Sequence, residues 1–319
     1  MTTSLLNLRR VRLAALGLTL FACAGALAGA DASAAAPPQR HFDSPDEALK
    51  ALLAAAKAGD RPAVDAIFGP GVGALLSGDA KQDAIEFASF TKSLERNAYW
   101  VRKADDRYVL NIGDQNWPMP IPLVGKDGSW FFDTAAGKDE IVNRRIGKDE
   151  ITAIRVCRTY IAAQREYASE DRDGSGVFKY AQKLRSAPGA RDGLYWKASP
   201  DDDQSPLGPL VAEARAEGYT HKTAEGEPQP FHGYLFKILT AQGPAAPGGA
   251  YDYVINGNMI AGFALVAYPA HWGESGVMTF IVNQWGKVYQ RNLGAGSAEI
   301  GAAMTEFNPD SGWTAVAPP

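Results

Sequence analysis

The chain has 319 residues, with 32 Lys and Arg against 36 Asp and Glu, which gives a formal net charge of −4 at pH 7. After residue 30, no run of basic residues is longer than two. Because binding to nucleic acid and to an anionic membrane surface both depend on clustered positive charge, the sequence argues against both kinds of partner.

The first 30 residues have the order of a secretory signal peptide. The basic segment "NLRRVR" precedes an apolar stretch over 13–30 that is rich in Leu, Ala and Gly, and small residues follow in A-x-A spacing. A membrane-spanning helix needs about 20 predominantly apolar residues, which this stretch does not supply. We therefore expect a signal peptide over 1–30, a flexible linker over 31–40, no transmembrane span after cleavage, and a periplasmic or secreted protein.

The chain has two cysteines, Cys23 and Cys157. Signal cleavage removes Cys23 and therefore excludes an internal disulfide from the exported protein. Cys157 lies on the apolar side of a predicted helix, which favours a buried and unreactive thiol. The segment "LFAC" also resembles a lipoprotein cleavage box, so lipidation of Cys23 is the alternative to cleavage by the ordinary route.

Three helices are predicted at the start of the exported chain. Ser44 and Glu47 have the spacing of a capping box, and Gly59 follows the last residue of the helical pattern. Further helical patterns cover 62–68 and 83–96.

Alternating runs rich in Tyr, Trp and Val follow over 98–114 and 117–134, with a Lys-Asp-Gly turn at 126–128. They predict an antiparallel hairpin or meander. Helices followed by a curved antiparallel sheet indicate an α+β domain over 41–148.

The second half begins with a long amphipathic helix, predicted from 149 onward. A short helix is predicted over 178–186 and another over 209–218, inside a stretch over 185–230 that is rich in Pro, Gly and Asp. Loops of that length are usually functional or mobile.

Four strand-like runs over 232–243, 251–270, 276–284 and 286–294 come last, and "NQWG" joins the final two as a hairpin. We expect a second domain over 149–319, in which the long helix packs on a small antiparallel sheet. The fold class is therefore α+β throughout.

One loop carries a candidate metal site. In the EF-hand pattern Asp171 takes position 1, Asp173 position 3 and Ser175 position 5, with Gly176 at the turn. Gln182 replaces the bidentate Glu at position 12, which weakens the match. The hypothesis is a calcium loop formed by Asp171, Asp173, Ser175 and Gln182, and the alternative is a helix-ending loop whose Asp side chains bond their own backbone. No other cofactor is expected, and no catalytic residue is assigned.

Two long segments, 117–168 and 233–294, carry a family resemblance: "WPMPIPLVGKDGSWFFDTAAG" begins the first and "GYLFKILTAQG" the second. Both closely resemble an exported bacterial family catalogued as domain of unknown function 2950. That resemblance implies no activity and no catalytic residues.

Each half of the chain also resembles a further family. The first half, with "SPDEALKALLAAAKAGD" before the meander, is similar to nuclear-transport-factor-like domains. That resemblance implies a cone-like fold over 41–148, with a small-molecule or adaptor pocket between helices and sheet. The second half, with "AIRVCRTYIAAQREYAS" and "GFALVAYPAHWGESGVMTFIVNQWGKVY", resembles the globular domain of type IV pilins and pseudopilins. The apolar first half of the pilin helix is missing, which argues against assembly into a pilus.

These observations favour an exported, non-catalytic binding or accessory protein of the bacterial cell envelope, whose partner is a small molecule or an envelope protein. The alternative is an enzyme, for example a hydrolase, with its site in the first-domain pocket or in the loop over 185–230. A pocket lined by aromatic and aliphatic side chains would favour binding, and converging acid and base groups would favour catalysis.

Overall fold

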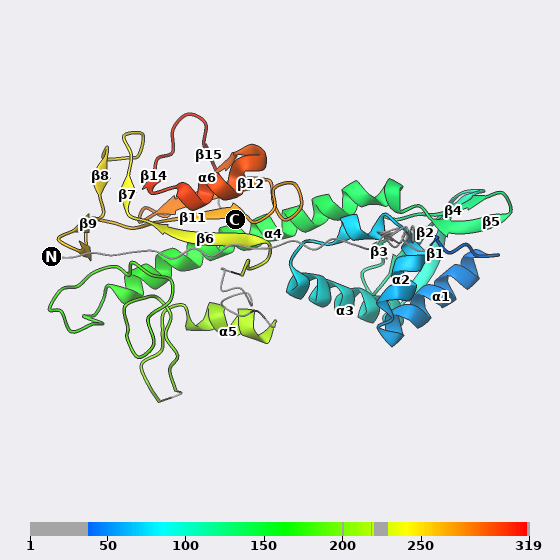
Figure 1. The fold of residues 1–319 in the computed structure, drawn as a ribbon, viewed down its shortest axis with the longest axis horizontal. Helices are drawn as coiled ribbons and strands as arrows, with labels where there is room; N and C mark the ends of the chain where they lie inside the picture. The colour runs from blue at the N-terminus through cyan, green and yellow to red at the C-terminus, as the bar shows by residue number, and fades with distance from the viewer. Residues whose placement is uncertain (1–37, 200, 218, 220–228, 318–319) are drawn as a thin grey trace, which may run out of the picture. The chain divides into compact units, whose positions relative to one another are not determined.

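The computed structural model describes residues 38–317 except 200, 218 and 220–228. The predicted signal peptide lies outside the described residues. Helices and antiparallel sheets alternate along the described chain, which confirms the α+β class (Figure 1).

The first half opens with the helices α1 (Pro45–Ala58), α2 (Arg61–Phe68), the 3-10 turn η1 (Val72–Leu75) and α3 (Ala80–Arg96). The predicted N-cap Ser44 is confirmed, but Glu47 bonds the amide of Asp43 and not the amide of the N-cap residue, so the capping box is only half formed. Ser44 Oγ accepts a hydrogen bond from the Glu47 amide at 3.2 Å, and Glu47 Oε2 accepts one from the Asp43 amide at 3.0 Å. Gly59 ends α1 with a φ of 63°, a conformation that favours glycine.

Five strands form the first sheet: β1 (Ala98–Ala104), β2 (Arg107–Ile112), β3 (Trp117–Pro118), β4 (Leu123–Lys126) and β5 (Ser129–Phe132). The order is β1-β2-β4-β5, all antiparallel, with β3 also paired to β2. Asp127 and Gly128 both have positive φ in the predicted β4–β5 turn. Helices and sheet enclose a hydrophobic core, hereafter the N-terminal cluster, that includes Leu52, Leu94, Leu110, Leu123 and Phe132.

Helix α4 (Thr134–Tyr167) begins well before the predicted start at 149. Asp133 caps its first turn by accepting a hydrogen bond from the Ala136 amide at 3.0 Å. A Cβ atom on Gly137 would lie 2.7 Å from the Ile121 backbone, so this glycine allows the first turns of α4 to approach the first sheet closely. The predicted boundary between 148 and 149 falls inside this helix, and the division into two domains stays a prediction.

The chain between α4 and the second sheet is mostly irregular and contains α5 (Gly208–Ala216) near the predicted position. The short helix predicted over 178–186 is wrong. The Tyr180 amide donates to Met259 O at 2.8 Å, as in a strand. The buried Gln164 side chain then bonds both the amide and the carbonyl of Ala181 at 2.8 Å. These bonds to distant residues replace the ones that a local helix would need.

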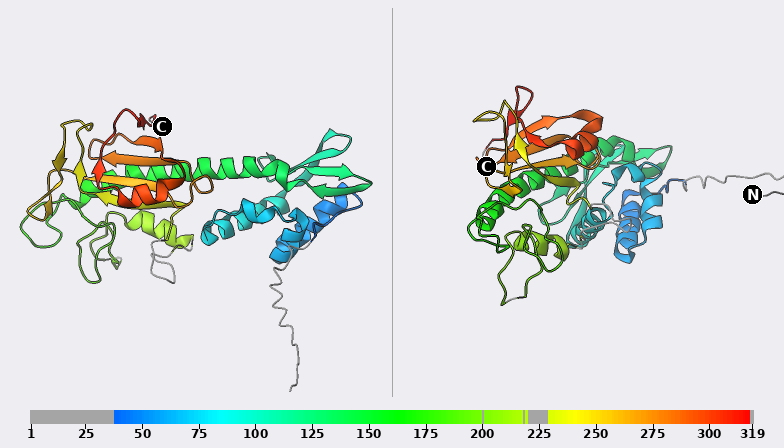
Figure 2. Two further views of the ribbon diagram at one scale, coloured as in Figure 1. Left: turned by 45° about the horizontal axis from the view of Figure 1, so that its top comes forward. Right: turned by 60° about the vertical axis from the view of Figure 1, so that its left-hand side comes forward.

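The second sheet has five strands: β6 (Tyr234–Leu239), β11 (Ala264–Pro269), β12 (Met278–Asn283), β13 (Tyr289–Asn292) and β15 (Thr314–Ala315). Its order is β15-β13-β12-β11-β6, with every pair antiparallel, which confirms the predicted β12–β13 hairpin. Smaller elements surround it in Figure 2: β7 (Ala241–Gln242), β8 (Tyr251–Asp252), β9 (Val254–Ile255), β10 (Asn258–Met259), η2 (Gly294–Gly296), α6 (Ser297–Ala303) and β14 (Glu306–Phe307).

The second half of α4 packs against this sheet. The Tyr160 ring lies 5.6 Å from the Phe263 ring, and its hydroxyl donates to Ala264 O at 3.1 Å. Helix α6 approaches Tyr268 of β11 so closely that a Cβ on Gly301 would lie 2.3 Å from its ring. This is the predicted long helix on an antiparallel sheet. The buried residues between this helix and the sheet form a second hydrophobic core, hereafter the C-terminal cluster, whose first and last members in the sequence are Ala153 and Phe307.

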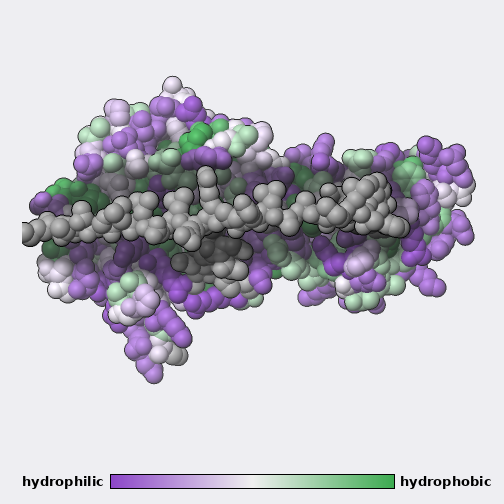
Figure 3. All heavy atoms as spheres, viewed as in Figure 1, coloured by the Kyte–Doolittle hydropathy of each residue, from purple (hydrophilic) through white to green (hydrophobic). Residues whose placement is uncertain are grey.

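On the face drawn in Figure 3, hydrophobic residues form small patches separated by hydrophilic ones. Within the described residues, no helix combines the length and the apolar character needed to cross a membrane.

Candidate ligand-binding cavity

A cavity of about 580 Å³ lies in the first half, between α2, α3, the first part of α4 and the first sheet. Its volume is within the range usual for small-molecule sites. Most of its wall is apolar, and these residues are Val64, Phe68, Val72, Leu75, Leu76, Ile85, Phe87, Phe90, Ile112, Trp117, Met119, Ile121 and Ile141.

Five of the seven charged wall residues come from α3 and α4 and form one group, hereafter the polar end, while the other two, Arg61 and Asp65, lie on α2. Helix α3 contributes Asp83 and Glu86, and α4 contributes Arg144, Arg145 and Lys148. Residues three, four and seven positions apart lie on one face of a helix, so the wall that α4 presents changes from apolar at 141 to cationic over 144–148. The cavity is therefore amphiphilic along its length.

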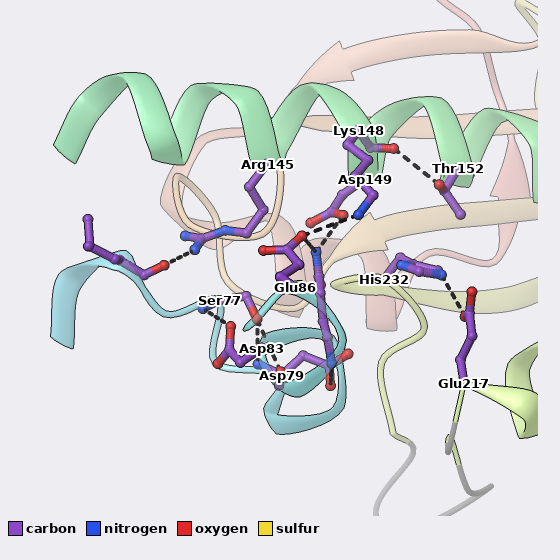
Figure 4. Close-up of polar contacts among 12 residues, drawn as sticks. Ser77, Asp79, Asp83, Glu86, Arg145, Lys148, Asp149, Thr152, Glu217 and His232 are labelled. Carbon is purple, nitrogen blue, oxygen red and sulfur yellow. Dashed lines mark hydrogen bonds and ion pairs between the residues drawn. The ribbon is translucent and has the colours of Figure 1, made fainter. Parts of the chain in front are cut away.

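Arg145 is the buried cation of the polar end, with only 4% of its surface exposed. Its Nη1 donates to Leu75 O, and its Nε donates to Glu274 O at 3.0 Å. Within the described residues Nη2 has no hydrogen-bond partner, and Arg145 forms no ion pair. In Figure 4 the side chains of Lys148 and Asp149 extend from α4 towards Glu86, while Arg145 extends towards the segment whose carbonyl accepts its hydrogen bond.

Asp149 lies next to this end and is fully buried. Its Oδ1 accepts a hydrogen bond from Gln82 Nε2 at 2.7 Å, while its Oδ2 has no partner among the described residues. Burial raises the pKa of the Asp149 carboxyl to about 7, against a smaller lowering by the Gln82 hydrogen bond. A Cβ on Gly233 would lie 3.2 Å from Oδ2, so little space remains around this oxygen.

The first turn of α3 holds Gln82 and Glu86 in position. Asp79 is the N-cap, and its Oδ1 accepts from the amides of Lys81 and Gln82 at 2.9 and 3.2 Å. The amide of Ser77 donates to Asp83 Oδ1 at 2.9 Å. Neither the cap nor the Gln82–Asp149 contact was part of the sequence prediction, which began the third helix at 83.

A smaller cavity of about 210 Å³ lies between α4, α5 and the second sheet. Next to it, His232 is 7% exposed, and its Nε2 lies 3.0 Å from Glu217 Oε2. Burial, and next the nearby Asp79 charge, raise the pKa of Tyr219. The burial of His232 was not predicted, because a lone His in a turn-rich segment gives no signal of burial in the sequence.

The predicted calcium residues are bonded within the protein. The Asp171 carboxylate accepts from the amides of Ser175 and Gly176 at 3.1 and 2.8 Å. Asp173 forms an ion pair with Lys179 at 2.7 Å, and this contact lowers the pKa of Asp173 to about 2. Hydrogen bonds from Asp side chains to the loop's own backbone are those expected of a helix-ending loop, which was the alternative to a calcium site.

Gln182, the fourth predicted ligand, donates through Nε2 to Gly257 O at 2.8 Å. In the part of the chain that the structure describes, no group of three or more His, Cys, Asp or Glu side chains could hold a metal ion. Calcium binding at 171–182 stays a prediction.

Two further groups bear on catalysis. His41 Nδ1 lies 2.9 Å from Ser129 Oγ, but both residues are outside the cavity wall, and the Ser129 hydroxyl also lies 3.3 Å from Lys126 O, as a donor to that carbonyl. Cys157 is fully buried, and burial raises the pKa of its thiol to about 12, which confirms the predicted unreactive thiol.

In a comparison with known families, a model described as "Protein of unknown function (DUF2950)" matches residues 39–316. The chain belongs to this family. The matched range contains both hydrophobic clusters and every residue of the cavity wall. No curated protein and no solved structure matches the chain. The DUF2950 match confirms the family resemblance, and the nuclear-transport-factor-like and pilin-like resemblances stay predictions.

Proposed function

We propose that this DUF2950 protein is an exported, non-catalytic binding module of the cell envelope, which holds a small amphiphilic molecule in the cavity of its first half. The observation that carries the proposal is the wall of the cavity. Thirteen aliphatic, aromatic and Met side chains surround a space of about 580 Å³, and five of the seven charged wall residues come from α3 and one turn of α4.

Such a wall stabilises a ligand by removing its apolar surface from water, while a few charged groups fix its orientation. The wall residues that the structure describes include Ser89 and Ser93 but no His and no Cys, the residue types that usually activate a nucleophile. An enzyme with a site here or in the loop over 185–230 stays the alternative.

The binding test uses the protein without residues 1–30 and Nile red, a neutral apolar dye. We expect saturable binding of one dye molecule per chain. Ser89→Trp places a large side chain on an exposed position of the cavity wall, and should weaken dye binding by about tenfold or more, equivalent to about 1.4 kcal/mol.

Ala88→Trp is the matched control, because Ala88 is exposed on the same helix but does not line the cavity. Both variants should keep the helical circular dichroism of the parent. Dye binding that is absent in the parent, or that both tryptophans reduce equally, would contradict the proposal.

A further inference from the structure

We propose that the ligand is an amphiphile with a single anionic head, such as a medium-chain carboxylate, and that the head binds at the polar end beside Arg145. This inference rests on the proposed function, since it names the ligand class for the same cavity. It follows from the charges of the wall, their existing partners and the position of the apolar surface.

The charged residues of the wall are positive in sum, although the chain as a whole is negative. The wall contains four basic side chains, Arg61, Arg144, Arg145 and Lys148, and three acidic ones, Asp65, Asp83 and Glu86. The chain has a formal charge of −4. One extra positive charge in an otherwise acidic protein is complementary to a ligand with one negative charge.

The exposed cations of the polar end already have partners. Lys148 lies 3.4 Å from Glu86, and Arg144 lies 2.7 Å from Glu140, which is outside the wall. Asp83 accepts the amide of Ser77. Arg145 differs, because the described residues give it two carbonyl acceptors and no carboxylate.

A buried charge without a counter-ion is costly, and it is usually compensated by a nearby group of opposite charge. Asp149 is one helical turn away, but it is engaged with Gln82. Burial also raises the pKa of Asp149 to about 7, so at neutral pH its carboxyl carries only part of a negative charge. An anion at the polar end would supply the missing charge at short range and in a region of low dielectric constant.

The remaining wall fits an alkyl chain. Phe87 and Phe90 on α3 and Ile141 on α4 belong to the apolar wall, and the Arg61 guanidinium lies over the Phe87 ring, 4.7 Å from its centroid. A carboxylate at Arg145 would therefore leave its hydrocarbon tail against aromatic and aliphatic side chains. A ligand with a positive head would meet the net positive charge of the same end.

The test compares three ligands of equal chain length on the protein without residues 1–30, at a pH near 6, where the Asp149 carboxyl is mostly protonated and a carboxylate head is ionised. Decanoate, decanol and decyltrimethylammonium are titrated against bound Nile red. Decanoate should displace the dye about tenfold more effectively than decanol, and the cation should be the weakest. Equal displacement by decanoate and decanol would overturn the anionic head and leave the binding cavity intact. Failure of all three ligands, together with failure of Nile red to bind, would overturn both proposals.

Arg145→Gln tests whether Arg145 is the residue that binds the anionic head. The variant should bind decanol as the parent does and lose the preference for decanoate. Lys138→Gln is the control, because Lys138 is exposed on α4 and outside the cavity wall, and it should keep the preference.

Since Arg145→Gln also removes bonds to two backbone carbonyls, the parent protein provides a second measurement. Salt screens exposed charges much more than buried ones. A decanoate preference that persists at high ionic strength supports Arg145, and one that salt abolishes assigns the effect to surface cations and overturns the proposal.

Discussion

Asp149 is fully buried, has a raised carboxyl pKa, and links α4 to α3 through its hydrogen bond with Gln82. Burial raises the pKa of its carboxyl from 3.8 to about 7. Because this value lies above that of the unfolded chain, the folded state holds the proton more tightly. The contribution of Asp149 to stability is therefore complete below about pH 4 and is lost as the pH rises through about 7.

We predict that Asp149→Asn changes the pH dependence of stability. The amide cannot ionise, so the variant should not lose stability as the pH rises from about 5 to about 8, whereas the parent should. The difference between their free energies of unfolding should change over this range by at most about 1.4 kcal/mol for each unit of pKa shift. Urea unfolding at several pH values measures this difference. Asp139→Asn, at an exposed position on the same helix, should follow the parent at every pH. Parallel profiles for Asp149→Asn and the parent would show that Asp149 does not titrate in this range.

The polar residues of the site were visible in the sequence, but their burial was not. Arg145 and Asp149 are charged residue types, and their neighbours in the sequence do not indicate that either is buried. What buries them comes from far along the chain: Gln82 on α3, Gly233 before β6, and the backbone of Glu274. Helical spacing predicts which residues share a face, and it does not predict which distant segment covers that face.

At the scale of the elements, the sequence predicted those features that depend only on neighbouring residues. The N-cap of α1 and the turn between β4 and β5 depend on neighbouring residues, and both are confirmed. The helix over 178–186 was wrong because its backbone bonds to β10 and to the Gln164 side chain. The start of α4 was missed because Gly137 lowers helical propensity, and its role appears only where the helix meets Ile121.

The contact between α4 and the second sheet supports a prediction about Phe280. Its side chain is fully buried on β12, and its ring lies 5.9 Å from the Tyr234 ring. Phe280→Ala should lower the free energy of unfolding by about 3–5 kcal/mol, because it removes a buried aromatic ring and leaves a cavity. Phe178, which is 65% exposed, is the control, and Phe178→Ala should change stability by no more than about 0.5 kcal/mol. Urea unfolding of both variants decides whether this position is core, since similar losses would contradict it.

At the scale of the molecule, the described chain has two hydrophobic clusters and one helix that contributes to both. Ile141 packs against the N-terminal cluster, and Ala153 belongs to the C-terminal cluster. Between them on α4, Arg145 bonds the Leu75 and Glu274 carbonyls, and Asp149 bonds Gln82. The predicted domains 41–148 and 149–319 therefore share α4, and their independence depends on whether the two clusters unfold separately.

We predict that they do, because each cluster has its own sheet and encloses its own fully buried side chains. Scanning calorimetry of the chain without residues 1–30 should then show two transitions. Leu52→Ala, at a fully buried position of the N-terminal cluster, should cost about 2–5 kcal/mol and lower the temperature of one transition. Phe280→Ala should lower the other. Asp149→Leu, which breaks the bond to Gln82, should change the separation of the two transitions more than the Asp139→Asn control does. A single transition that both core substitutions lower together would show instead that α4 and its polar contacts couple the clusters into one cooperative unit.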